Sequence, residues 1–86
     1  MKILKFYAEW CNPCKVLSNN IDKFKESHPE IEFVSINVDV EEGEDLVEKY
    51  GIRNLPVLVK LDNGSEVSRN VGILTVPGLE KFILNK

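Results

Sequence analysis

The chain contains two cysteines, and only two residues separate them. Cys11 and Cys14 flank Asn12 and Pro13, and Trp10, the only tryptophan in 86 residues, comes directly before them. This spacing allows one thiolate to attack a disulfide bond that involves the other sulfur. Two cysteines at this spacing, next to a predicted strand and helix, are typical of thiol–disulfide redox chemistry.

The cysteine pair is predicted to lie where a strand passes into a helix. Residues 3–8 are apolar and aromatic enough for a buried strand, and residues 12–27 carry apolar side chains at helical spacing. Unpaired N–H groups at a helix N-terminus stabilise a thiolate, so we expect a lowered pKa for Cys11. Cys14 lies one turn further on, on the inward face. Cys11 is therefore predicted to attack and Cys14 to resolve, and Pro13 suits a first turn because its missing N–H costs nothing there.

Two other roles for the cysteine pair remain open. A structural zinc site needs four ligands, and His28 is the only histidine, so one chain cannot supply a usual set. A purely structural disulfide would stabilise the fold only weakly, because it closes a very short loop. Both alternatives are weaker than redox chemistry.

Length and composition favour one small globular domain over residues 1–86. Hydrophobic residues make up 43% and charged residues 29%, as in ordinary water-soluble domains. The net charge of −3 argues against nucleic acid or an acidic membrane surface as a partner. No stretch approaches the roughly 18 apolar residues of a membrane span. Lys5 interrupts the apolar start, so a secretory signal is not expected, and the cytoplasm is the predicted compartment.

The remaining elements follow from apolar periodicity and turn residues. An acidic cluster at residues 41–45 is interpreted as the first turn of a short helix, where the helix dipole favours acids, rather than as a metal site. Asn63-Gly64 predicts a hairpin turn, and Thr75 is a candidate helix cap. The predicted order is βαβαββα, an α/β fold with a four-stranded mixed sheet and three flanking helices. Its strands are expected at residues 3–8, 31–39, 57–61 and 66–71, and its helices at 12–27, about 41–50 and 76–84.

Three segments resemble the thioredoxin family in the right order and at the right separations. Residues 6–15 resemble its active-site segment, with Asn12 where glycine is usual; residues 50–56 resemble the segment that ends in a cis-proline; and residues 71–73 resemble the glycine segment of its substrate groove. The chain begins at the family's second strand, so the N-terminal strand and helix of full-length thioredoxins are expected to be absent.

The resemblance implies a substrate-binding surface beside the cysteines. Pro56 would follow a cis peptide bond, and the backbone of Leu55 would pair with an extended substrate segment. Gly72 and Ile73 would line the same groove. Trp10 is interpreted as an apolar surface beside the sulfur rather than as a core side chain.

Two lysines supply charge near the predicted motif, Lys15 directly after Cys14 and Lys5 in the strand before it. The family usually carries a buried aspartate where this chain has Lys5, beneath the resolving cysteine. Lys5 either lies on an exposed edge or face, with its ammonium in water, or lies beneath the motif, where a cation favours both thiolates. The sequence leaves both interpretations open.

The resemblance implies a monomeric protein-disulfide reductase that needs no metal or bound organic cofactor. Thioredoxin reductase, which uses NADPH, would recharge it, and disulfide-containing proteins such as ribonucleotide reductase would be its substrates. Two alternatives remain. The first is a glutaredoxin-type enzyme recharged by glutathione, and the second is a non-catalytic binding subunit with the same fold.

Overall fold

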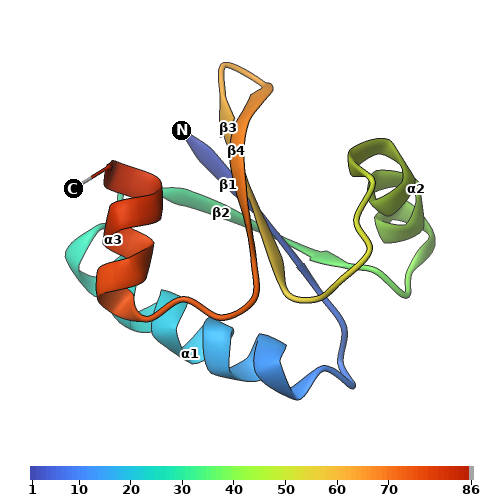
Figure 1. The fold of residues 1–86 in the computed structure, drawn as a ribbon, viewed down its shortest axis with the longest axis horizontal. Helices are drawn as coiled ribbons and strands as arrows, with labels where there is room; N and C mark the ends of the chain where they lie inside the picture. The colour runs from blue at the N-terminus through green and yellow to red at the C-terminus, as the bar shows by residue number, and fades with distance from the viewer. Residues whose placement is uncertain (86) are drawn as a thin grey trace.

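The computed structural model describes residues 1–85, which form one sheet with helices on both faces (Figure 1). The order of elements confirms the predicted βαβαββα pattern. They are β1 (Lys2–Tyr7), α1 (Asn12–Ser27), β2 (Glu32–Asn37), α2 (Glu41–Tyr50), β3 (Val57–Asp62), β4 (Ser65–Val71) and α3 (Val76–Leu84).

The sheet has four strands in the order β2-β1-β3-β4. β1 runs parallel to β2, as expected for two strands joined by a helix, and antiparallel to β3. β3 and β4 form the predicted hairpin through Asn63 and Gly64, both of which have positive φ angles of 53° and 82°. The sheet is therefore mixed, and β1 is one of its two inner strands.

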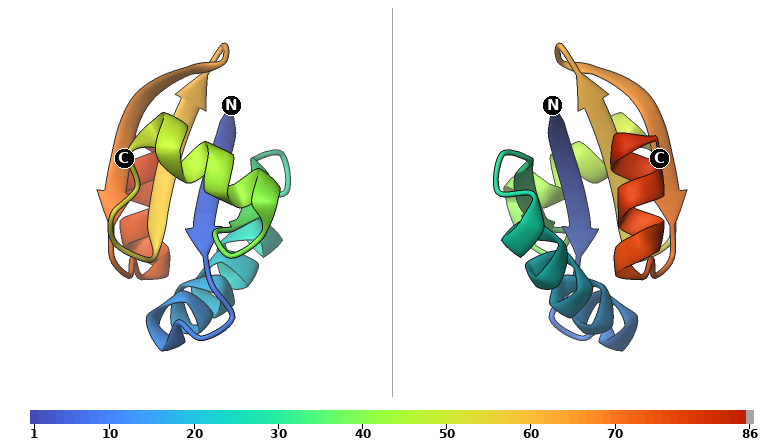
Figure 2. Two further views of the ribbon diagram at one scale, coloured as in Figure 1. Left: turned by 90° about the vertical axis from the view of Figure 1, so that its right-hand side faces the viewer. Right: turned by 90° about the vertical axis from the view of Figure 1, so that its left-hand side faces the viewer.

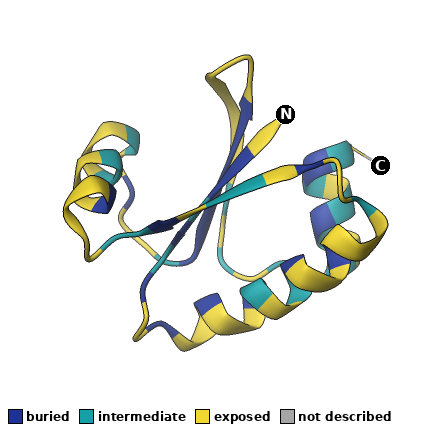
Figure 3. Cartoon of the chain, turned by 180° about the vertical axis from the view of Figure 1, so that it is seen from behind, coloured by how far each residue is buried: buried dark blue, intermediate teal, exposed yellow. Residues whose placement is uncertain are grey.

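The helices bury two separate apolar clusters against the sheet. α1 and α3 cover one face, and α2 lies against the other (Figures 1 and 2). Alternation along β1 divides its side chains between the faces, with Ile3 toward α1 and α3, and Leu4 and Phe6 toward α2. The inward stripe of α1 predicted from the sequence is buried (Figure 3), and its members are Cys14, Leu17, Ile21 and Phe24.

Capping residues predicted from the sequence mark the start of α3 and the end of α2. The hydroxyl of Thr75 accepts a hydrogen bond from the N–H of Gly78 at 3.2 Å, which caps α3. Gly51 ends α2 with a φ of 64°, in the left-handed region that glycine adopts without a steric penalty. Within residues 1–85, no helix is both long enough and apolar enough to cross a membrane.

The predicted strand over residues 31–39 is longer than the observed β2, which ends at Asn37. The side-chain oxygen of Asn37 accepts a hydrogen bond from the N–H of Asp39 at 2.9 Å. This local bond turns the chain away from the sheet, because asparagine side chains compete with the backbone for such donors. Asp39 therefore lies beyond the end of the strand.

Gly43 marks the closest approach between α2 and the end of β2. It is buried, and a Cβ atom at this position would lie 2.7 Å from the carbonyl carbon of Asn37 and 3.2 Å from the Cα of Val38. These neighbours are backbone atoms, which cannot rotate out of the way. Glycine thus permits the contact that places α2 against the sheet.

Candidate redox site

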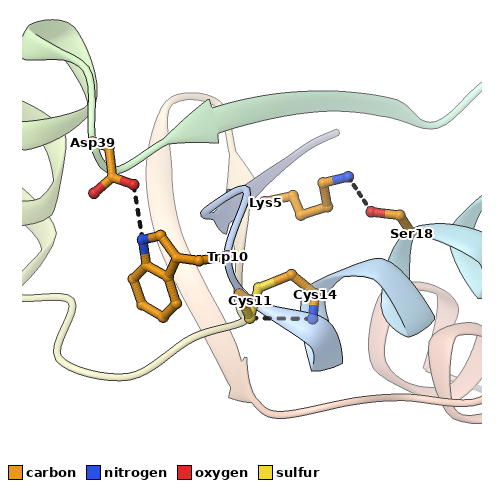
Figure 4. The surroundings of a disulfide bond; sticks show 6 residues. All are labelled: Lys5, Trp10, Cys11, Cys14, Ser18 and Asp39. Atoms are coloured by element: carbon orange, nitrogen blue, oxygen red, sulfur yellow. Dashed lines mark hydrogen bonds between the residues drawn. A yellow bond between two sulfur atoms is a disulfide. The ribbon is translucent and has the colours of Figure 1, made fainter.

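Cys11 and Cys14 form a disulfide at the N-terminus of α1 (Figure 4). Cys11 is the N-cap residue, and its sulfur accepts a hydrogen bond from the backbone N–H of Cys14 at 3.2 Å. The sequence predicts this proximity of a sulfur to the first N–H groups of the helix. The same N–H group would stabilise a thiolate on Cys11 after the disulfide is reduced.

The two cysteines line different pockets. Cys11 lines a groove of about 600 Å³, whereas Cys14 lines a second pocket of about 370 Å³. Both cysteines are buried, with exposed fractions of 4% and 2%. The larger groove thus gives an incoming molecule access to Cys11 rather than to Cys14.

The groove is built from segments that are far apart in the sequence. Its predicted members are Trp10, Asn12, Pro13 and Leu55, which the structure brings together around Cys11. The sequence did not identify the rest of the wall. It comes from the end of β2, from α2 and from the segment before β3, and consists of Val38, Val47, Ile52, Arg53 and Asn54.

Trp10 lies at the surface beside the disulfide, with an exposed fraction of 69%. Its indole Nε1–H donates a hydrogen bond to the Oδ2 atom of Asp39 at 2.9 Å (Figure 4). The carboxylate fixes the orientation of an aromatic side chain that is otherwise free to rotate. Asp39 is a site residue that the sequence analysis missed, although the end of a predicted parallel strand, where it lies, is where open α/β sheets gather binding residues.

Of the predicted substrate-binding residues, Leu55 lines the groove, whereas Pro56, Gly72 and Ile73 are not part of its wall. The Leu55–Pro56 peptide bond is cis. The N–H of Gly72 donates to the carbonyl of Pro56 at 2.9 Å, which holds the two segments together. Ile73 is exposed, so it offers an apolar side chain next to this junction.

No metal-binding arrangement accompanies the disulfide in the part of the chain that is described. Residues 1–85 contain no group of three or more histidine, cysteine, aspartate and glutamate side chains that could hold an ion. The acids of residues 41–45 fall in the first turns of α2, as the dipole interpretation predicts. His28 lies at the far end of α1, where its ring stacks on Phe24.

The family model named Thioredoxin matches residues 1–85. The chain belongs to the thioredoxin family. It is 39% identical over 70 residues to thioredoxin-1 of Saccharomyces cerevisiae, an alignment that covers 81% of this chain and 66% of the yeast protein. It is 36% identical over 70 residues to the mitochondrial thioredoxin-2 of Schizosaccharomyces pombe, covering 81% of this chain and 51% of that protein. This chain thus spans less than two thirds of the length of either relative.

Solved structures agree with the family membership. Oxidised mitochondrial thioredoxin 3 of Saccharomyces cerevisiae is 28% identical and superimposes with a TM-score of 0.85, covering 99% of this chain and 77% of the other. The thioredoxin-like fold predicted from the sequence is therefore confirmed.

Lys5 is the clearest departure from the thioredoxin pattern described above. β1 lies between β2 and β3, so Lys5 is not on an edge strand, and its side chain is half-buried. Its Nζ donates a hydrogen bond to the hydroxyl of Ser18 on α1 at 2.7 Å (Figure 4). Burial lowers the pKa of Lys5 from its usual 10.5, and the nearby carboxylate of Asp22 partly opposes this effect. Lys5 therefore does not lie on a sheet edge, but its side chain lies partly exposed on one face of an inner strand, next to α1.

Once the disulfide is reduced, we expect the two thiols to react at different rates with an alkylating reagent near neutral pH. Cys11 lines the larger groove and is next to the helix N-terminus, whereas Cys14 is buried beneath it. If the pKa values of the two thiols differ by one unit, their thiolate fractions below both pKa values differ about tenfold, and so do their labelling rates. Mass spectrometry of protein labelled for short times should therefore find Cys11 modified first. Equal labelling of both cysteines would contradict the assignment of Cys11 as the attacking residue.

Proposed function

We propose that this protein is a thiol–disulfide oxidoreductase that reduces disulfides in other proteins. The observation that carries the proposal is a disulfide at a helix N-terminus, with Cys11 lining an open groove and Cys14 lying behind it. Membership of the thioredoxin family supports the same activity.

The proposed reaction has two exchange steps. The Cys11 thiolate attacks a substrate disulfide, so a bond forms between Cys11 and one substrate sulfur, while the other substrate sulfur leaves as a thiolate and takes up a proton. Cys14 then loses its proton and attacks the sulfur of Cys11. This second step forms the Cys11–Cys14 disulfide and releases the remaining substrate sulfur. Two electrons pass to the substrate, and they come entirely from the two cysteines.

The groove supports this reaction by positioning an extended substrate segment. Trp10, Asn12 and Pro13 line the groove from the motif, and Leu55 lines it from the segment before β3. We propose that the backbone of Leu55 pairs with the substrate backbone, as strand addition would require. Pro56, Gly72 and Ile73 would then support and extend this contact.

The proposed electron donor is a thioredoxin reductase that uses NADPH, and the proposed setting is the cytoplasm, where the protein would act as a monomer. Relatives include a mitochondrial thioredoxin, so family membership alone leaves the compartment open. Its substrates would be disulfide-containing proteins such as ribonucleotide reductase. No metal or bound organic cofactor is required, because the two sulfurs hold the electrons. Recharging by glutathione is the alternative.

Turnover with two electron sources tests the proposal. The oxidised protein is mixed with a disulfide-containing protein and NADPH, together with either a thioredoxin reductase or glutathione and its reductase, and the oxidation of NADPH is followed by absorbance. We expect faster turnover with thioredoxin reductase. Faster turnover with glutathione would establish the glutaredoxin-type alternative, and no turnover with either donor would contradict a reductase function.

A further inference from the structure

A second pocket reaches the disulfide from the side opposite the groove. It has a volume of about 370 Å³, and its wall includes Cys14 and Lys5 but not Cys11 or Trp10. Figure 4 shows the two sides clearly, with Trp10 and Asp39 on one side of the disulfide and Lys5 and Ser18 on the other. The pocket therefore connects the resolving cysteine with a charged side chain that the two exchange steps do not use.

The ammonium group of Lys5 is held in place by α1. Its Nζ donates to the hydroxyl of Ser18 at 2.7 Å and lies 5.3 Å from the centre of the Tyr7 ring. Ser18 follows Cys14 by four residues, so the two side chains lie on the same face of α1, about 6 Å apart along its axis. The hydrogen bond to Ser18 thus fixes the cation about one helical turn from Cys14.

Other charged groups surround this pocket, and their effects largely oppose each other. Glu9 and Lys15 lie exposed at its wall and carry opposite charges. Asp22 and Lys25, both exposed on α1, act on Lys5 in opposite directions. Solvent screens interactions between such exposed groups strongly. The half-buried Lys5 is consequently the cation with the strongest influence on Cys14.

We propose that Lys5 is a positioning residue for the second exchange step, in which its ammonium stabilises the thiolate of Cys14 while the pocket admits solvent that accepts the proton. This inference rests on the proposed function. Cys14 must lose its proton before it can attack the sulfur of Cys11, and burial alone disfavours the charged thiolate. A cation one helical turn away offsets that penalty. A carboxylate at the position of Lys5 would instead oppose the thiolate.

The protonation state of Lys5 is consistent with this role. Burial lowers the pKa of Lys5, whereas partial contact with solvent and the carboxylate of Asp22 favour the charged form. These two effects act in the direction that the proposed role requires. Because the folded-state pKa lies below the usual 10.5, the charged form costs stability at pH values below the folded-state pKa, and this cost is lost as the pH rises from the folded-state pKa through 10.5.

The test measures the pKa of Cys14 directly, in a Cys11→Ser background where Cys14 is the only thiol. Thiolate absorbance near 240 nm is recorded against pH for the background protein and after adding Lys5→Met, Lys5→Arg or Lys2→Met. We expect Lys5→Met to raise the pKa of Cys14 by about one, which is a tenfold smaller thiolate fraction below the pKa. Lys5→Arg should largely restore the original value. Lys2→Met, which removes an exposed lysine from the same strand, should leave it unchanged.

Two outcomes would overturn the inference: an unchanged pKa of Cys14 in Lys5→Met, or an equal rise in Lys2→Met. Thermal melts check the fold, and Lys5→Met should melt at the same temperature or higher because a half-buried charge has been removed. The readout needs no substrate or reductase, so a protein that fails to turn over still reveals whether Lys5 acts on Cys14.

Discussion

Cys14→Ser is expected to abolish turnover and to leave the protein covalently attached to its substrates. Cys11 keeps its hydrogen bond from the helix N-terminus and its place in the groove, so it still attacks a substrate disulfide. Serine cannot form a disulfide, so the second exchange step does not occur. Non-reducing electrophoresis should show a one-to-one complex with a disulfide-containing protein, and a reductant should dissociate it.

Cys11→Ser is the matched control for this experiment. It leaves Cys14 as the only thiol, with an exposed fraction of 2% and no place in the wall of the groove, so no complex should accumulate. Equal accumulation in both variants would show that Cys11 is not the sole attacking residue. The double variant, with serine at both positions, separates catalysis from binding. A protein that acts only as a binding subunit would keep its biological role without either sulfur, whereas the proposed reductase would lose it.

The helices and strands were largely predictable because local signals and packing agree along most of the chain. The helix over residues 12–27 was predicted with its observed limits, since Pro13 marks its first turn and the proline after His28 prevents its continuation. The end of β2 was not predictable from apolar periodicity alone. Val38 continues the apolar pattern and its N–H still donates to the carbonyl of Tyr7, but the side-chain oxygen of Asn37 accepts from the N–H of Asp39 and turns the backbone there.

The candidate site was predictable from local pattern only where its chemistry lies in one segment, and Leu55 and the cis bond before Pro56 were predicted only through the family resemblance. The two closely spaced cysteines, with the tryptophan and proline beside them, predicted the redox pair and the part of the groove that the motif itself forms. The rest of the wall includes Val47 and Arg53. It depends on how α2 and the segment before β3 fold back toward the motif, and no local sequence pattern shows that they do. The hydrogen bonds from Trp10 to Asp39 and from Lys5 to Ser18 join residues 29 and 13 positions apart, so they became visible only in three dimensions.

Gly43→Ala is expected to destabilise the protein by about 3 kcal/mol, the upper part of the usual range for overpacking a buried site. The added methyl group would meet the carbonyl of Asn37 and the Cα of Val38, so either α2 or the end of β2 must move. For a domain of this size, such a loss lowers the melting temperature by about 15 °C. Circular dichroism of the oxidised proteins during heating measures this difference.

Gly78→Ala provides the control, because Gly78 is also a helical glycine but its surroundings differ. A Cβ atom there would lie 3.2 Å from the end of the Leu74 side chain and 3.4 Å from the hydroxyl of Thr75, and both of these side chains can move slightly. Alanine also gains about 1 kcal/mol over glycine in helix propensity, so we expect little change in stability or a small increase. If Gly43→Ala melted as high as Gly78→Ala, α2 would be free to move away from β2. The fluorescence of Trp10 would then show whether that movement also disturbs Asp39 and the groove beside Cys11.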